Sequence, residues 1–232
     1  QTYVPDDNFE AYLETHNSNG SIVSIGSPNS MGNGIPNDDY VTTANINNIT
    51  GLNVEYQNIS DLTGIEDFTA LTYLNVFVNQ LTTLDVSNNT ALERFVCGGN
   101  QLTTLDVSQN TVLYVLMCGD NPLTILDVSN NTALSTLYCY SNQLTTLDVS
   151  NNTALATLEC QSNQLTTLDV SQNTALTILR CDENYLTTLD VRNGNNTNMF
   201  ISYLNFTNNP QLYCIDVDDF QYSLFNWTNI DP

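Results

Sequence analysis

Two kinds of chemically reactive side chain, thiols and carboxylates, recur along the chain at a spacing of twenty-one residues. Thiolates bind zinc or form disulfides, and carboxylates on adjacent layers can bind calcium. The regularly spaced cysteines are Cys97, Cys118, Cys139, Cys160 and Cys181. The regularly spaced aspartates are Asp85, Asp106, Asp127, Asp148, Asp169 and Asp190, which we take as candidate metal ligands.

The cysteine spacing is a poor match to a zinc site, because zinc ligands usually come in closely spaced pairs. Each cysteine instead ends an apolar LxxLxC or LxxFxC pattern. This favours a column of buried free thiols that act as small hydrophobic residues. Disulfides between neighbouring layers are the less favoured alternative, because parallel stacked side chains seldom offer the dihedral angle required. Cys214 lies outside the column and has no evident partner in the sequence.

The aspartate column raises the question of charge repulsion, since stacked strands lie about 5 Å apart. At that distance two carboxylates repel by about 1 kcal/mol in water, and the chain has no lysine. We expect each carboxylate to accept hydrogen bonds from the turn that follows it or from threonine hydroxyls, and Asp216 to continue the column. Calcium bound between aspartates is the alternative, and ice binding by the regular threonines beside them is a third possibility.

The sequence gives little sign of catalysis. The single histidine, His16, lies outside the repeats, and none of the common nucleophile, phosphate-binding or metalloprotease motifs occurs. Glycoside hydrolysis needs two carboxylates in unlike surroundings, whereas the aspartates here share one sequence context. We therefore expect a protein that is not an enzyme and needs no cofactor.

The acidic composition limits the classes of partner that the protein can bind. The chain has 25 acidic residues and three basic ones, for a formal net charge of −22. This excludes electrostatic binding to nucleic acid and disfavours an anionic membrane surface. No segment is long and apolar enough to span a bilayer. The balance fits a soluble extracellular protein, and a start at Gln1 is what a secreted protein shows after loss of its signal.

Nearly identical twenty-one-residue copies begin at Leu81, Leu102, Leu123, Leu144 and Leu165. Each copy joins an LxxLDV half to an LxxLxC half that is followed by asparagine. This pattern resembles leucine-rich repeats, and is most similar to the short bacterial class called IRREKO repeats. The resemblance extends over about residues 49–217 and implies a β-rich solenoid with a curved parallel sheet and little helix.

The physics of the repeat agrees with that resemblance. Alternating apolar positions form a short strand, and stacking of successive copies pairs these strands in parallel. The asparagine after each strand should turn inward and bind backbone groups at the bend, because an unpaired buried amide is costly. These asparagines are Asn79, Asn100, Asn121, Asn142, Asn163, Asn184 and Asn209.

Both ends of a solenoid must be covered. Residues 1–48 are expected to form a cap with a short helix, in which Asp7 is the N-cap, Glu10 its reciprocal partner, and Phe9, Tyr12 and Leu13 the apolar face. Residues 218–232 are expected to form the other cap. Its aromatic residues should cover the last layer, and they are Phe220, Tyr222, Phe225 and Trp227.

Both end segments resemble those of secreted Bacteroidetes leucine-rich-repeat proteins. In that family a further cysteine, which could pair with Cys214, and a sorting domain often follow the last segment, and neither is present in these 232 residues. The resemblance also implies a location in the medium or on the bacterial surface.

The outward positions of the LxxLxC strands differ at nearly every copy, whereas the opposite wall repeats Thr-x-Asp almost letter for letter. Variable residues on a rigid scaffold suit recognition. We therefore expect an extracellular recognition or adhesion module that binds a protein or a cell-surface polysaccharide. Neutral drift on a structural spacer is the alternative interpretation. The candidate contact residues are Tyr73, Phe77, Arg94, Met117, Tyr138, Tyr140, Glu159, Arg180 and Tyr203.

Overall fold

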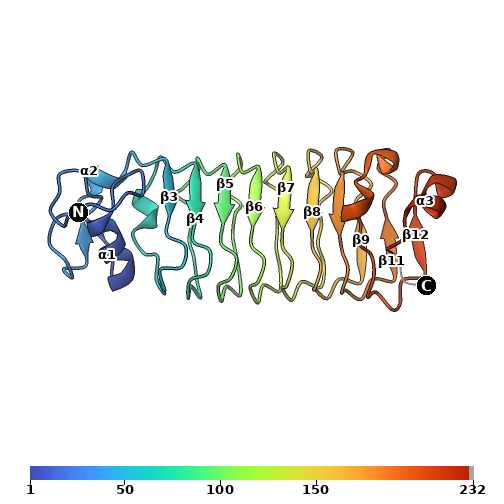
Figure 1. Ribbon diagram of the computed structural model, residues 1–232, viewed down its shortest axis with the longest axis horizontal. Coiled ribbons are helices and arrows are strands. Elements are labelled where there is room, and N and C mark those ends of the chain that lie inside the picture. The colour runs from blue at the N-terminus through green and yellow to red at the C-terminus, as the bar shows by residue number, and fades with distance from the viewer. Residues whose placement is uncertain (230–232) are drawn as a thin grey trace.

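Each copy of the repeat forms one turn of a solenoid in the computed structural model, which describes residues 1–229. The turns stack along one axis, with a helical segment at each end (Figure 1). Seven parallel strands form the main sheet in the order β10-β8-β7-β6-β5-β4-β3. Their bounds are Gly51–Asn53 (β3), Tyr73–Asn75 (β4), Arg94–Val96 (β5), Val115–Met117 (β6), Thr136–Tyr138 (β7), Thr157–Glu159 (β8) and Ile178–Arg180 (β10). The expected leucine-rich-repeat solenoid is confirmed.

The opposite wall becomes a sheet only towards its C-terminal end. There β9 (Thr167–Asp169), β11 (Thr188–Asp190) and β12 (Cys214–Asp216) pair in parallel. Asp190 lies opposite both Asp169 and Asp216. Asp216 therefore continues the aspartate column, as expected.

The core contains the leucines, valines and cysteines that repeat from turn to turn. All five column cysteines are fully buried and free, whereas Cys214 is free and only partly buried. Burial raises the pKa of every column thiol, that of Cys118 to about 12. The prediction of buried free thiols is confirmed, and these thiols stay protonated at neutral pH.

The inward asparagines form the expected hydrogen-bonded ladder. Asn142 Nδ2 donates to the carbonyl oxygens of Cys118, Cys139 and Tyr140, each at 3.1 Å. Its Oδ1 accepts from the Leu123 amide at 3.0 Å. One side chain therefore serves the backbone of two neighbouring turns.

A second buried asparagine ladder, which we did not anticipate, lies at the turn after the LDV half. Asn131 Nδ2 donates to Val107 O at 3.0 Å and to Asn110 O at 2.9 Å, and neighbouring turns repeat this pair of bonds. The invariant asparagine before the threonine of SNNT and SQNT was the available signal. Its members are Asn89, Asn110, Asn131, Asn152 and Asn173.

The residue before each first-ladder asparagine has left-handed backbone geometry. Most turns place a residue other than glycine there, including Val78 at φ 51° and Ser141 at φ 50°, and one places Gly99 at φ 65°. A β-branched side chain is strained in this region. Val78 therefore stores local strain in the second turn.

Replacing Val78 by glycine should raise the free energy of unfolding by about 1 kcal/mol, because strain is relieved at an exposed position. Denaturant titration measures this change. The matched variant Gly99→Ala should act in the opposite direction, because a Cβ there lies 2.9 Å from Val78 Cγ2 at positive φ. A destabilised Val78→Gly protein would contradict this account of the turn.

The N-terminal cap contains α1 (Asp7–Thr15), α2 (Thr43–Ile46) and the antiparallel pair of β1 (Thr2–Tyr3) and β2 (Tyr40–Val41). Phe9, Tyr12 and Leu13 are buried, as expected. The predicted N-cap, however, is wrong. The N-cap is Asp6, whose Oδ1 accepts from the amides of Asn8 and Phe9.

The C-terminal segment also differs from expectation, because it forms a helix, α3 (Phe220–Asn226). Trp227 is buried and meets Phe206 edge-on, with ring centroids 5.7 Å apart. Phe220 and Phe225 are 64% and 77% exposed and do not cover the last turn. Residues 230–232 of the expected cap lie outside the described residues.

Three short 3-10 helices complete the described elements, η1 (Ile65–Asp67), η2 (Asn196–Asn198) and η3 (Ile201–Tyr203). Among residues 1–229, no helix has the length and apolar character needed to cross a membrane.

Candidate functional site

The outward side of the main sheet, here called the variable face, contains most of the candidate contact residues. Strand alternation buries the central residue of each strand, such as Leu137 of β7, and turns its neighbours outward. Six candidates lie on strands of this sheet, and they are Tyr73, Arg94, Met117, Tyr138, Glu159 and Arg180. Phe77 and Tyr140 follow β4 and β7 by two residues and continue the face along the turns.

Tyr203 does not belong to this strand array. It lies in η3 and is 55% exposed, because the last repeat begins with a 3-10 turn instead of a strand. Within residues 1–229, Asn205 alone continues the sheet beyond β10, through a bridge to Arg180. The expected strand position of Tyr203 is therefore wrong.

Charged and aromatic side chains of the variable face interact between neighbouring strands and within a single turn. The Arg94 guanidinium lies over the Tyr73 ring, 5.5 Å from its centroid, which is a cation–π geometry. Arg180 forms an ion pair with Asp182 at 3.6 Å. Asp182 was not among the candidates; it is almost fully buried, and burial raises its pKa although Arg180 opposes that shift.

Two glycines separate the rings of Phe77 and Tyr140 along one edge of the face. A Cβ at Gly119 would lie 2.8 Å from the Tyr140 ring, and one at Gly98 would lie 3.4 Å from the Phe77 ring. Each ring therefore lies against a turn that lacks a side chain. In the sequence these glycines occupy variable positions, and the sequence alone did not reveal that the aromatic rings pack against them.

The tyrosines at the centre of the variable face remain neutral hydrogen-bonding groups. Burial, followed by the nearby Glu159 carboxylate, raises the pKa of Tyr138. Burial, followed by the charges of Asp120 and Glu159, raises the pKa of Tyr140. Both hydroxyls can donate and accept hydrogen bonds at neutral pH.

The opposite wall shows how the aspartate column is accommodated. Asp127 Oδ1 accepts from the Ser129 amide at 2.9 Å, and the other column members make the same bond to the residue two positions on. The expected local hydrogen bonds are confirmed. Arg192 adds ion pairs to Asp190 and Asp216 at the C-terminal end of the column. Calcium binding by this column stays a hypothesis.

These serine bonds lower the pKa of Asp127. Its ionised form therefore stabilises the fold above the unfolded-state pKa of about 3.9, and that contribution is lost as pH falls through the lower folded-state pKa. Asp127→Asn should unfold more readily than the parent at pH 7, and the two should converge as the pH falls below the folded-state pKa of Asp127. Urea titrations at several pH values measure the difference.

Glu93→Gln removes the same charge from an exposed strand-flanking position and serves as the control. Its effect at pH 7 should be smaller than that of Asp127→Asn. A more stable Asp127→Asn protein would show instead that repulsion within the column outweighs the serine bonds.

Carboxylates also line a hollow of about 460 Å³ on the opposite wall, here called the constant wall because its Thr-x-Asp residues repeat from turn to turn. These carboxylates are Asp61, Glu66 and Asp85. Each accepts a nearby amide, from Thr63, Gly64 and Ser87 respectively. An acid–base pair needs two carboxyl groups in unlike surroundings, whereas these three have similar surroundings.

The single histidine, His16, lies in the cap and stacks on Tyr12, with ring centroids 3.9 Å apart. The expectation of a protein without enzymatic activity stays a prediction.

Stacked parallel strands, an asparagine ladder and a leucine core define a leucine-rich-repeat solenoid. The structure is similar to the functional domain of InlJ from Listeria monocytogenes, which is described as including a cysteine ladder. The TM-score is 0.61 at 27% identity, and the match covers 99% of this chain and 61% of that one. This chain therefore spans about three-fifths of that structure's length.

Two further solved structures have the same fold. Internalin C2 from Listeria monocytogenes matches with a TM-score of 0.67 at 21% identity, over 99% of this chain and 95% of that one. A leucine-rich-repeat protein from Leptospira interrogans matches with a TM-score of 0.59 at 22% identity, over 77% of this chain and 46% of that one. A family model described as LVIVD repeat matches residues 113–141. No curated protein matches the chain.

Proposed function

We propose that this protein is an extracellular recognition module that binds a partner protein through the variable face. The observation that carries the proposal is the contrast between the two walls. Backbone register and core repeat from β4 to β10, whereas the outward residues change at each strand. The constant wall keeps its aspartates and their serine bonds from turn to turn.

The size and composition of the variable face suit a macromolecule. The two outward positions of each of the seven strands, with the turn position two residues beyond each strand, make 21 positions, of which 16 are at least partly exposed. This is somewhat fewer than the roughly 20–30 residues that one partner contributes to a standard interface. Tyrosine and arginine are favoured interface anchors. Tyr138, Tyr140 and Arg180 supply such side chains. Tyr138 and Arg180 both lie opposite Glu159 of β8, one on each side, and Tyr140 follows Tyr138 by two residues.

The structural neighbours are bacterial leucine-rich-repeat proteins, among them internalins. Their fold supports a protein-interaction role at a bacterial surface or in the medium. Adhesion is the process that such a location favours. A cell-surface polysaccharide is the second class of ligand to be distinguished by experiment.

Binding of the purified protein to bacterial cells, and to protein and polysaccharide fractions extracted from their surfaces, tests the proposal. The variant Tyr138→Ala, Tyr140→Ala, Arg180→Ala should bind at least about ten-fold more weakly, because it loses three anchors. Circular dichroism and thermal unfolding confirm that the variant is folded. Unchanged binding by the folded variant would contradict the proposal, and binding confined to the polysaccharide fraction would replace the protein partner.

A further inference from the structure

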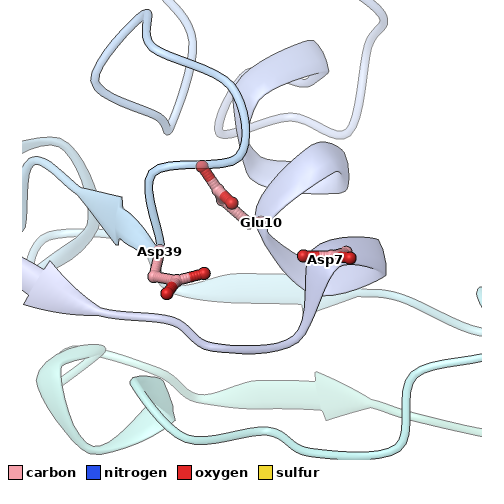
Figure 2. A group of neighbouring side chains, drawn as sticks. All are labelled: Asp7, Glu10 and Asp39. Atoms are coloured by element: carbon pink, nitrogen blue, oxygen red, sulfur yellow. The ribbon is translucent and has the colours of Figure 1, made fainter.

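The N-terminal cap brings three carboxylates together on the side of α1 that faces the start of β2. One oxygen from each of Asp7, Glu10 and Asp39 lies within 4.8 Å of the other two. Asp7 and Glu10 come from the first turn of α1, and Asp39 from the segment that enters β2 (Figure 2). Residues far apart in the sequence therefore converge at one point.

Glu10 distinguishes this cluster from an exposed acidic patch. Its side chain is fully buried, and Oε1 accepts from the Asp38 amide at 3.2 Å. Oε2 is also buried, but it has no hydrogen-bond partner among the described residues. A buried carboxylate oxygen is costly to leave without a donor or a cation.

No basic side chain compensates this charge within the described residues. The ion pairs of the structure all lie between residues 180 and 216. His16 is at the far end of α1, where Nδ1 faces the Tyr12 carbonyl at 2.9 Å. The N-terminal amine lies beyond Thr2, which pairs with Val41 and not with Asp39.

The remaining acidic groups of the cap already have partners. Glu14 is buried and accepts from the amides of Asn33 and Gly34. The Asp38 carboxylate accepts from Asn33 Nδ2 and from the Tyr40 amide. The cluster of Asp7, Glu10 and Asp39 is thus the part of the cap whose carboxylate oxygens are left to bind something else.

We infer that Asp7, Glu10 and Asp39 form a calcium site. Calcium takes oxygen ligands at about 2.3–2.6 Å, so two ligands of one ion lie no more than about 4.6–5.2 Å apart. The three oxygens all lie within 4.8 Å of one another, which meets that condition. Calcium tolerates irregular geometry and accepts water as its remaining ligands, which suits a site with one buried and two accessible carboxylates.

Bound calcium would link α1 to the β1–β2 pair and so stabilise the cap over the first turns. A divalent cation would supply the buried Glu10 Oε2 with the partner that it lacks among the described residues. The constant wall differs, because each of its aspartates already accepts a serine or arginine amide.

The test is calorimetric titration of CaCl₂ into the whole chain after EDTA treatment, with thermal unfolding in parallel. We expect one saturable calcium site and a rise in the unfolding temperature of about 3 °C or more at saturating calcium. Asp7→Asn and Asp39→Asn should each weaken binding by at least about ten-fold. Asn is tolerated at the left-handed backbone of position 39, φ 62°, so this variant should fold.

Asp127→Asn on the constant wall is the matched control and should bind calcium like the parent. Absence of saturable binding in the parent would overturn the inference. So would cap variants that bind calcium with the same affinity as the parent, or a loss of affinity confined to Asp127→Asn, which would assign calcium to the wall. Binding of MgCl₂ with equal or higher affinity would overturn the assignment to calcium.

Discussion

Asn142→Ala should lower the free energy of unfolding by about 3–5 kcal/mol. The substitution leaves the buried Leu123 amide without its acceptor and removes one of two donors from the carbonyl oxygens of Cys118, Cys139 and Tyr140. A buried amide left unsatisfied costs about 1–3 kcal/mol, and each of the other lost hydrogen bonds about 0.5–1.5 kcal/mol. Because Asn142 joins two neighbouring turns, the loss should also weaken the coupling between the halves of the solenoid.

Urea unfolding followed by circular dichroism measures this loss. Gln143→Ala removes an exposed side chain at the next position and should change stability by less than about 0.5 kcal/mol. A solenoid that loses coupling should show a broader transition as well as a lower midpoint. If Asn142→Ala cost less than about 1 kcal/mol, the ladder would not be a main source of stability.

Asp6→Ala should have the second largest effect, a loss of about 2–4 kcal/mol concentrated in the N-terminal cap. Its Oδ1 caps α1, and its Oδ2 accepts from the Ser60 amide, the Ser60 hydroxyl and the Asp61 amide. Loss of an N-cap alone costs about 1 kcal/mol. The additional loss comes from the bonds that fasten the cap to the turn at Ser60.

The contribution of Asp6 should depend on pH. Burial alone would raise its pKa, but the hydrogen bonds from Ser60, Phe9 and Asp61 outweigh burial and lower it. The stabilisation is therefore present above the unfolded-state pKa and is lost as pH falls through the folded-state pKa. The parent and Asp6→Ala should differ most near neutral pH and converge in acid.

Hydrogen exchange of residues 7–15 and urea unfolding together measure the effect of Asp6→Ala. Asp7→Asn, studied in calcium-free buffer, alters the adjacent exposed carboxylate and should leave exchange in α1 nearly unchanged. Equal effects of the two substitutions would mean that Asp6 acts only through its charge. The account requires that it act through its five hydrogen bonds.

The repeated part of the fold was predictable because one period sets register, core and ladder together. Leu137 and Cys139 alternate as a strand requires, and Asn142 follows at the bend in every copy. The second ladder, at Asn131, was equally regular. We missed it because its asparagine lies among other polar turn residues and carries no apolar signal.

The caps were less predictable because long-range contacts decide them. Asp6 and Asp7 are both acceptable N-caps from sequence alone, and the contact with Ser60 selects Asp6. Glu10 fits a capping box by spacing, yet it is buried against the Asp38 segment. No short sequence pattern encodes that approach.

On the variable face too, the positions set by the repeat were predictable, whereas those set by contacts between turns were not. The strand alternation located Tyr138 and Glu159 on the outward side. The ring of Tyr140 against Gly119 depends on the next turn and could not be inferred from one copy. The predicted strand position of Tyr203 was wrong because its repeat begins with a 3-10 turn, in which side chains do not alternate as they do along a strand.

The most direct test of recognition by the variable face measures the affinity of two double-alanine variants, one on each wall, for the same fraction extracted from bacterial surfaces. The face variant is Tyr138→Ala with Tyr140→Ala, and the wall variant is Thr145→Ala with Thr146→Ala, both exposed threonines of the following half-turn. We predict at least about a ten-fold loss of affinity for the face variant and less than about two-fold for the wall variant. Equal losses, or a loss confined to the wall variant, would contradict the account.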